Sequence, residues 1–463
     1  MNIEQLSQRR RTHLLLFILA GLFFAIFAAL HAGPAEPSGS AFADWVKGKY
    51  ASGGWFGVRD TLENHGIDVH GYWKGTFYGL TGGGLDSPRG AFDEEIRLGI
   101  TLDFGKLAGI EGLTADGSVR WRDGRNPNEY VGASSNFNPS KYQSGQQWRL
   151  MPFYLTYVTP ELFGVKKLLT ISGGWQNPYD FFADQPDSKL FMSNAIAVTK
   201  GIGGVNGFPW SSSYAAWGGF LKVKPVDWYY AMAGLYLAIP QATKMPNHGL
   251  DLAGYAPNPS DNGLYFLAET GVTPKLGAAK LPGKYAFGSI YWGLENKAFD
   301  GEVCDQKYTF YWQADQMLFR EPSPAPAPAL AGKNFKEPVT EPKLSEEGLY
   351  AFSFVNFAPA YDNAMPFYFH TGLVYKGLIP GRDRDQLGIA FGYGNYSYDK
   401  IVAEADAGQS VHQTYEAVVE ADYRVQLTKF IYLQPFWQYI VRPDGTGIAH
   451  NANVFGLHMG VTF

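Results

Sequence analysis

The chain has 463 residues, a formal net charge of −5 and one cysteine, Cys304. The single cysteine excludes a disulfide framework and a cysteine-based zinc site, and the net negative charge gives no sign of a basic nucleic-acid-binding surface. Charged residues make up 17% of the chain, compared with about 25% in an average soluble domain. Hydrophobic residues reach 46% and the mean hydropathy is −0.18, so apolar and polar residues are finely interleaved. This pattern excludes both a bundle of membrane helices and a disordered chain.

The N-terminus carries the pattern of a secretory signal peptide. Three arginines at 9–11 precede an apolar run over 14–30, and Ala41-Phe42-Ala43 supplies the small residues of a cleavage site. We therefore expect residues 1–43 to be a signal peptide, removed on export. Cleavage at Ala32 and an uncleaved membrane anchor are the alternatives.

The segment that follows is short. Residues 44–67 are expected to lie in the periplasm, and the amphipathic stretch Asp60–His65 with its flanks predicts a short helix. About two dozen residues are too few for an independent domain before the first strand. An energised import receptor, which needs a folded plug domain there, is thereby disfavoured.

From residue 68 to residue 463 the dominant pattern is a period of two, broken by Gly, Pro, Asn and Asp. In the last such stretch every second residue is apolar: Phe455, Leu457, Met459, Val461 and Phe463. Sixteen stretches can be counted, beginning near residues 68, 93, 112, 148, 168, 211, 226, 263, 284, 307, 347, 367, 386, 414, 430 and 453. An even number is what a single-chain bacterial barrel requires.

Two features favour a membrane barrel over a soluble sandwich. Aromatic residues recur near the ends of the stretches, as in Tyr72-Trp73, Trp228–Tyr230 and Tyr432–Tyr439, which is typical of the girdles at the two membrane interfaces. The chain also closes on an alternating strand ending in Phe463. We predict an all-β protein, a single transmembrane antiparallel β-barrel of about 16 strands of the outer-membrane porin type.

The connections sort by length. With Phe463 on the periplasmic side, the periplasmic turns are mostly short, at Thr428-Lys429, Lys224-Pro225 and 380–385, and the external connections are longer, at 124–147, 177–210 and 239–262. The segment 177–210 is our candidate for a loop that folds into the pore. The proline-rich connection 321–346 breaks the asymmetry; it is predicted to be a periplasmic semi-rigid linker, with a partner-binding segment as the alternative.

Catalytic and metal-binding patterns are weak. The chain has no G-x-S-x-G motif, and His370, His412 and His458 are isolated, as expected of ordinary polar residues. Glu94 and Glu95 are adjacent in a strand, so they face opposite sides and cannot flank one glycosidic bond. We expect no enzyme activity, no catalytic or metal site and no cofactor. A barrel enzyme acting on lipid or polysaccharide, and an adhesion barrel, are the alternatives.

Several segments resemble the carbohydrate-selective porins, the OprB family. They are Gly54–Leu62 (GWFGVRDTL) with Gly66–Asp68, Gly263–Pro274 (GLYFLAETGVTP), Gly372–Arg382 (GLVYKGLIPGR), Tyr415–Pro435 and Asn451–Phe463. The phenylalanine in Gly54-Trp55-Phe56-Gly57, where the family usually has glycine, and the proline-rich insertion depart from the family pattern.

The resemblance implies an outer-membrane channel of sixteen strands for passive diffusion of small sugars, either a trimer or a single barrel. The expected partners are permeating sugars, outer-membrane lipid and the barrel-assembly machinery, which would recognise the strand ending at Phe463; no nucleic acid is expected. Strand parity places charged residues on the lumen side, opposite apolar neighbours. The predicted sugar-binding wall consists of Glu95, Arg97, Arg120, Arg122, Glu416, Glu420 and Arg424.

Overall fold

The computed structural model describes residues 41–142, 147–197, 206, 215–237, 248, 263–293, 295–322 and 345–463. The chain divides into two units, residues 1–48 and 49–463. In the first unit, helix α2 spans Ala41–Lys47, and the rest of the predicted signal peptide lies outside the described residues. Within the described part of the chain, no helix is both long and apolar enough to cross a membrane.

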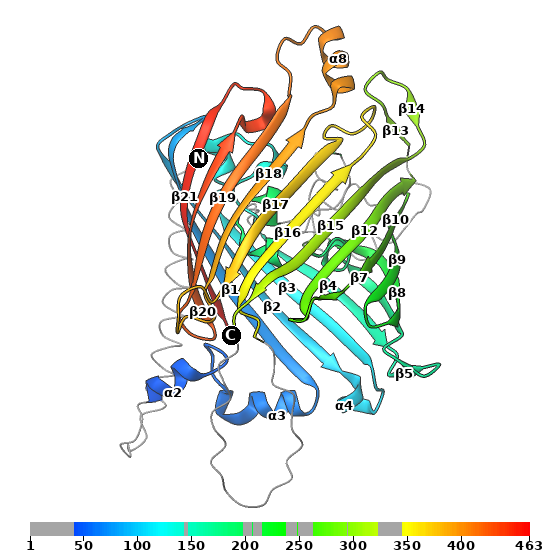
Figure 1. Cartoon of the computed structure of the whole chain (residues 1–463), viewed down its shortest axis with the longest axis vertical. Helices are drawn as coiled ribbons and strands as arrows, with labels where there is room; N and C mark the ends of the chain where they lie inside the picture. The colour runs from blue at the N-terminus through cyan, green and yellow to red at the C-terminus, as the bar shows by residue number, and fades with distance from the viewer. Residues whose placement is uncertain are drawn as a thin grey trace, which may run out of the picture. The chain divides into compact units, whose positions relative to one another are not determined.

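The second unit is a closed barrel (Figure 1). Its long strands are β1 (Ile67–Gly84), β2 (Arg89–Asp103), β3 (Leu113–Gly124), β4 (Gln147–Val158), β7 (Leu169–Gln176), β8 (Ala216–Val226), β9 (Tyr229–Leu237), β10 (Leu264–Val272), β12 (Leu281–Gly293), β15 (Lys307–Arg320), β16 (Gly348–Phe357), β17 (Phe367–Lys376), β18 (Gln386–Asn395), β19 (Tyr415–Gln426), β20 (Ile431–Val441) and β21 (His450–Thr462). Each pairs antiparallel with the next, and β21 pairs with β1 to close the sheet. The predicted sixteen-stranded barrel is confirmed, with strand starts within a few residues of those expected.

Short strands and helices lie in the connections between the long strands. The two-residue strand β11 (Lys275–Leu276) extends the sheet beside β12. Two small hairpins, β5 (Glu161–Leu162) with β6 (Val165–Lys166) and β13 (Asn296–Lys297) with β14 (Val303–Cys304), lie in other connections. Helices α4 (Phe104–Ala108) and α8 (Tyr398–Asp406) lie at opposite ends of the barrel (Figure 1).

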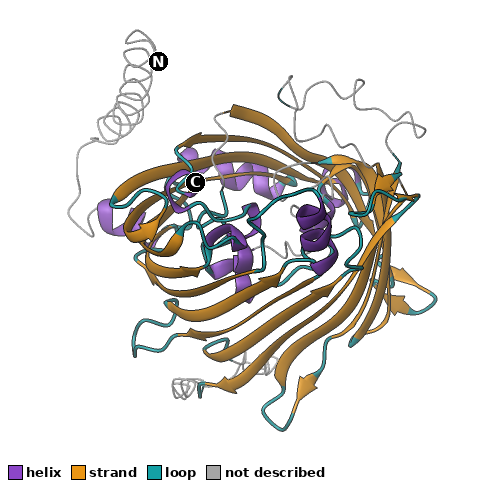
Figure 2. Cartoon of the chain, turned by 90° about the horizontal axis from the view of Figure 1, so that it is seen from above, coloured by secondary structure: helices purple, strands orange, loops and turns teal. Residues whose placement is uncertain are grey.

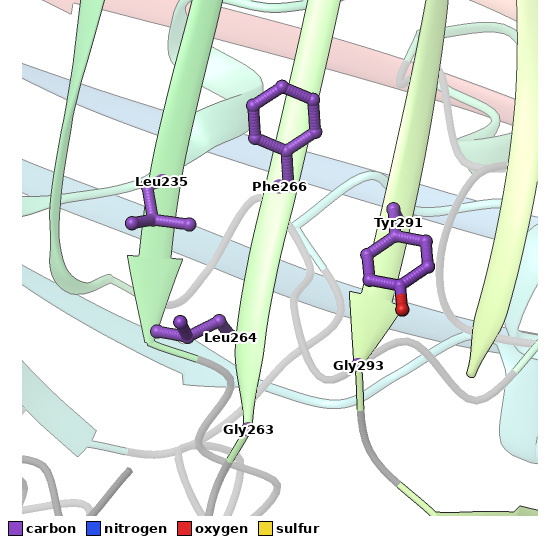
Figure 3. Close-up of a pocket in the computed structure, with 6 residues that line it drawn as sticks. All are labelled: Leu235, Gly263, Leu264, Phe266, Tyr291 and Gly293. Atoms are coloured by element: carbon purple, nitrogen blue, oxygen red, sulfur yellow. The ribbon is translucent and has the colours of Figure 1, made fainter. Parts of the chain in front are cut away.

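The two faces of the wall differ as the alternation predicts. On β21, Phe455 is 51% exposed on the outside, whereas His458 is fully buried on the inside. Leu264 and Phe266 of β10 project outward beside Leu235 of β9 and Tyr291 of β12 (Figure 3). The outer face of these strands is therefore mainly apolar, and buried polar side chains such as His458 lie on the inner face.

The aromatic pairs are divided between these faces. Adjacent residues in a strand point to opposite sides, so Trp73 faces outward and its indole nitrogen donates to Glu94 Oε2 at 2.8 Å. Tyr72 faces the lumen and donates to Glu95 Oε1 at 2.5 Å. Tyr230 and Tyr432, also assigned to the girdles from the sequence, are likewise on the lumen side. The assignment of these three tyrosines to girdles was wrong.

The connections have the predicted asymmetry, except for the long connection 321–346 on the Phe463 side and one short connection at the other end. At the end away from Phe463, the connection between β1 and β2 is only residues 85–88. At the other end, Lys224-Pro225 is not the turn: both residues lie within β8, and the turn is Asp227-Trp228. A register shift between Val223 and Val226 accommodates Pro225, which has no backbone N–H for the ladder.

The proline-rich connection 321–346 has ends that meet. Glu321 donates its backbone N–H to the carbonyl of Glu347 at 2.9 Å, and the Tyr375 hydroxyl donates to the Glu321 carboxylate. Residues 323–344 lie outside the described residues. The two ends of the connection therefore lie side by side, where β15 pairs with β16.

The segment before the barrel contains the predicted short helix, α3 (Val58–Asn64). Arg59 of this helix is 2% exposed, with its guanidinium 3.5 Å from the Tyr50 ring centroid and a bond of 2.5 Å to the Val69 carbonyl in β1. The backbone N–H of Ala51 donates to Thr462 of β21 at 2.9 Å. The segment is thus bound to both strands that form the closing seam.

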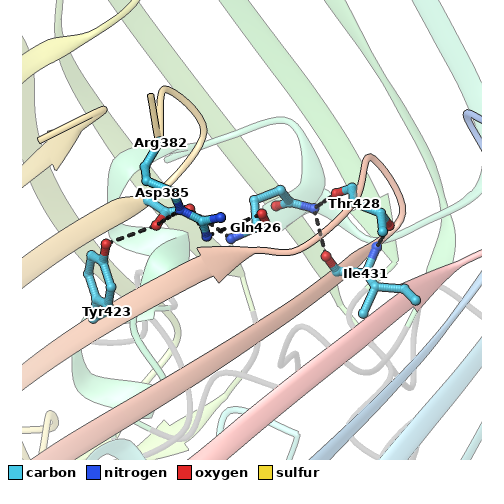
Figure 4. Close-up of polar contacts among 6 residues, drawn as sticks. All are labelled: Arg382, Asp385, Tyr423, Gln426, Thr428 and Ile431. Atoms are coloured by element: carbon cyan, nitrogen blue, oxygen red, sulfur yellow. Dashed lines mark hydrogen bonds and ion pairs between the residues drawn. The ribbon is translucent and has the colours of Figure 1, made fainter. Parts of the chain in front are cut away.

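A polar cluster joins two neighbouring turns on the Phe463 side (Figure 4). The Asp385 carboxylate accepts two bonds of 2.9 Å from Arg382, one of 2.8 Å from the Tyr423 hydroxyl and one of 2.9 Å from the Gln426 backbone N–H. Burial alone would raise the pKa of Asp385, but these donors outweigh it and hold the pKa below its usual value. The charged form of Asp385 therefore stabilises the fold.

Replacing Asp385 with asparagine is expected to lower the stability of the barrel by about 2 kcal/mol at neutral pH, since hydrogen bonds to charged groups are lost. Because the folded-state pKa is depressed, this stabilisation is complete above the unfolded-state pKa of about 4 and disappears as the pH falls through the folded-state value. Heat-dependent gel mobility measures the midpoint of the unfolding of the barrel. The matched change Asp383→Asn, at an exposed position of the same turn, should have no effect; equal losses for both variants would contradict the prediction.

Candidate functional site: a lumen narrowed by two inward-folded segments

Two connections fold into the barrel (Figure 2). We call residues 125–142, between β3 and β4, segment I, and residues 177–197, between β7 and β8, segment II. Segment I contains helix α5 (Asn128–Val131), and segment II contains helix α6 (Asn194–Ala197). The expectation that 177–210 folds into the pore is met by its described part, and segment I joins it.

Segment II is bound to several walls. Its Ala183 N–H donates to Glu269 of β10 at 2.7 Å. The side chain of Gln185 lies 2.6 Å from His370 of β17 and donates to carbonyls of β15 and β16 at 3.2 and 3.0 Å. Asp187 forms an ion pair of 2.8 Å with Lys376. The segment therefore crosses the interior and narrows the channel.

Two predicted lumen carboxylates hold these segments. Glu420 accepts the backbone N–H groups of Met192 and Ser193 at 2.6 and 2.9 Å. Glu416 accepts the N–H of Ser134 in segment I at 3.2 Å and that of Asp444 at 2.9 Å. Both glutamates are 0% exposed. Their oxygens are occupied by loop amides, so they position the constriction without facing the open channel.

Apolar packing completes the constriction. Phe137 of segment I and Phe182 and Phe191 of segment II are fully buried. They pack in one cluster with inward-facing wall residues such as Tyr265 of β10 and Phe352 of β16. Burying an aromatic side chain contributes about 1.5–3 kcal/mol, so the cluster and the carboxylate anchors together hold the segments in place.

The remaining predicted residues lie on the wall of β2, β3 and β19. Glu95 forms an ion pair with Arg122 and lies 3.8 Å from Arg120. Arg97 donates to Ser118 at 3.1 Å. Arg424 donates to Gln434 at 2.8 Å. The structure thus gathers these five residues on neighbouring parts of the wall, whereas Glu416 and Glu420 lie beneath the inward-folded segments.

Sequence reasoning missed several charged residues of this region. Lys74 of β1 lies 4.0 Å above the Tyr72 ring, on the same face of the strand. Lys141 of segment I donates to the carbonyls of Lys189 and Phe191 at 2.8 and 2.7 Å, joining the two segments. Arg149 of β4 is opposite Arg120 in the register. Lys74 is paired with Glu95 across the β1–β2 ladder, so strand parity could have placed it on the lumen side. The position of Lys141 depends on how segment I folds.

The histidines have hydrogen-bond partners. His458 lies 2.9 Å from the Thr76 hydroxyl and 2.8 Å from that of Tyr432, and His370 contacts Tyr368 and Gln185. Glu94 and Glu95 face opposite sides of the wall, as predicted. Within the described ranges, no group of His, Cys, Asp and Glu side chains could hold a metal ion.

The sequence profile described as "Carbohydrate-selective porin, OprB family" matches residues 90–463, most of the chain. The chain belongs to the OprB family. This OprB-family porin is 24% identical to Porin B of Pseudomonas aeruginosa over 96% of the chain and 97% of that protein. It is also 24% identical to the "Putative porin QuiX" of Acinetobacter baylyi over 89% of the chain and 92% of that protein.

The fold of the OprB-family porin has a solved counterpart. The structure titled "High pH structure of Pseudomonas putida OprB" superposes with a TM-score of 0.77 at 21% identity, covering 90% of this chain and 99% of that one. The barrel fold and the family membership agree: the protein is an outer-membrane porin of the carbohydrate-selective class.

Proposed function

We propose that small sugars cross this barrel by passive diffusion through the channel left beside segments I and II. The observation that carries the proposal is a polar wall, in which partly exposed Arg97 and Arg424 lie near the buried Glu95–Arg122 ion pair, within a lumen narrowed by folded loops. A narrow passage brings a solute against the wall, where hydroxyl groups can exchange hydrogen bonds with water for hydrogen bonds with protein.

The predicted wall residues would divide into two roles. Arg97 and Arg424, which are partly exposed, would contact the solute, and Glu95, Arg120 and Arg122 would form the hydrogen-bonding wall behind them. Glu416 and Glu420 would act indirectly by fixing the loops that define the passage. Because each hydrogen bond with the solute replaces one with water, a bond to one of these arginines contributes only about 1.5–3 kcal/mol, which keeps sugar binding weak enough for release.

Sugar block of ion current in planar bilayers tests this role for the arginine pair. The double change Arg120→Ala with Arg122→Ala should weaken block by roughly fivefold, equivalent to about 1 kcal/mol. Arg384→Ala, at an exposed position of a turn, is the matched control. If the double variant folds and sugar block stays as strong as in the parent, the two arginines serve only to hold the wall together.

Liposome swelling with a panel of sugars tests the channel itself. The parent protein should admit monosaccharides and show an open conductance, since the proposed function involves no catalytic step. A barrel without conductance or sugar passage would contradict the proposal and favour the barrel enzyme acting on lipid or polysaccharide.

The remaining assignments are part of the same proposal. Residues 1–43 would be a signal peptide, residues 44–67 a periplasmic segment, and the connection 321–346 a periplasmic linker. Outer-membrane lipid would surround the apolar outer wall, and the assembly machinery would bind the strand that ends at Phe463. N-terminal sequencing of the mature protein tests the cleavage, and native mass spectrometry tests for a homo-trimer.

A further inference from the structure

The cations that face the lumen are unevenly matched by carboxylates. Arg120 and Arg122 share Glu95 as their ion-pair partner, and all three residues are buried. Their charges are therefore directed at one another within the wall.

Three other cations have a different environment. Lys74 lies over the ring of Tyr72, and Arg424 lies 4.6 Å from the Tyr432 ring centroid and donates to Gln434. Lys141 donates to two backbone carbonyls of segment II. All three are partly exposed, and among the described residues their charged groups make hydrogen bonds and ring contacts with neutral partners. We call Lys74, Lys141 and Arg424 the cationic patch.

The members of the patch are electrostatic neighbours. The charge of Arg424 acts on Lys74, and both act on Lys141. Three carboxylates of the described residues act on the patch. Glu95 acts on Lys74 but is already shared by Arg120 and Arg122. Asp422 and Glu420 act on Lys141, but Asp422 accepts from Gln434 at 2.5 Å and is 2% exposed, and Glu420 is bound to loop amides. Because these carboxylates are shared with other cations or bound within the wall, an anion in the channel beside the patch would meet a net positive charge.

Polar groups suited to hydroxyls lie elsewhere around the passage. Asp116 of β3 accepts from Thr101 at 2.7 Å and is partly exposed, and Asp180 of segment II is exposed. The charge of Arg97 acts on Asp180. This part of the lumen offers carboxylate acceptors beside a cation, which suits the hydroxyls of a polyol more than it suits a second carboxylate.

We propose that the cationic patch selects sugar acids, carbohydrates that carry one carboxylate, over neutral sugars of the same size. This inference rests on the proposed function, since it specifies which carbohydrates the channel prefers. In a water-filled passage a single cation about 4 Å from the carboxylate raises its local occupancy by about fivefold. The attraction stays weak enough for the solute to leave.

Glucose and gluconate are the test pair, because they share a carbon skeleton and gluconate carries the carboxylate. The purified full-length porin is reconstituted in bilayers and liposomes, and acetate serves as an anion without a polyol chain. We expect gluconate to block ion current at a concentration about fivefold lower than glucose, because one or more cations attract its carboxylate. We also expect chloride to permeate better than potassium in a salt gradient. Acetate should give no block.

Lys74→Met should reduce both the gluconate preference and the chloride preference, and the double change Lys74→Met with Arg424→Met should reduce them further. Lys222→Met is the matched control, because Lys222 also lies over a tyrosine ring, 4.3 Å from the Tyr230 centroid on β8, and should leave both preferences unchanged. If the double variant fails to fold, the result with the single variant Lys74→Met tests the inference.

The outcomes separate the two proposals. Glucose block and passage equal to or stronger than those of gluconate would overturn the sugar-acid inference and leave the proposed function standing. An open channel that admits neither carbohydrate would overturn the proposed function itself. Block by acetate as strong as that by gluconate, or an unchanged preference in folded Lys74→Met, would also overturn the inference.

Discussion

Replacing Glu420 with alanine is expected to raise the single-channel conductance and to make the open current noisy. The Glu420 carboxylate accepts two backbone N–H groups of segment II, and a hydrogen bond to a charged group contributes about 1.5–3 kcal/mol. Losing both would reduce the stability of the docked segment by about 3 kcal/mol or more, a change of over a hundredfold in its equilibrium with displaced forms. Conductance in planar bilayers measures the result.

Two variants control this experiment. Glu420→Gln keeps an acceptor but loses the charge, so its effect should be intermediate. Glu404→Ala removes a carboxylate that pairs with Lys400 on helix α8, outside the barrel wall, and should leave the conductance unchanged. A folded Glu420→Ala protein with parental conductance and noise would show that Glu269, Gln185 and the buried aromatic residues hold segment II without Glu420.

Phe463→Asp is expected to abolish assembly of the barrel in cells. Phe463 exchanges two backbone hydrogen bonds of 2.9 Å with Gly71, at the end of the β1–β21 seam. A charged residue near a membrane interface costs only about 0–1 kcal/mol, too little to unfold the barrel. Loss of assembly would therefore reflect failed recognition of the last strand, as proposed above. The heat-modifiable band in outer-membrane fractions measures assembly.

Refolding in detergent separates recognition from stability. Purified Phe463→Asp should refold to a heat-modifiable barrel, because the machinery is not required there. Phe463→Tyr, which keeps an aromatic end, should assemble in cells like the parent. Normal assembly of Phe463→Asp in cells would contradict a role of the last side chain in recognition, and failed refolding in detergent would assign the defect to stability.

The local pattern of the chain determined the barrel. Side chains alternate across a strand with a period of two, so Phe455 and His458 could be assigned to opposite faces from their parity alone, and the structure agrees. The same parity placed Glu95, Arg120 and Glu420 on the inner face. Strand number and starts followed from where this alternation is interrupted, since both are local properties of the sequence.

Only the tertiary structure decided what each inner side chain meets. Glu420 binds the N–H of Met192, 228 residues away in the chain, and Gln185 contacts His370, 185 residues away. No period in the sequence encodes such a partner, because it depends on how two loops without regular alternation fold back into the lumen. For the same reason parity could place Glu416 and Glu420 inside the barrel but could not distinguish a residue that anchors a loop from one, such as Arg424, that faces the channel.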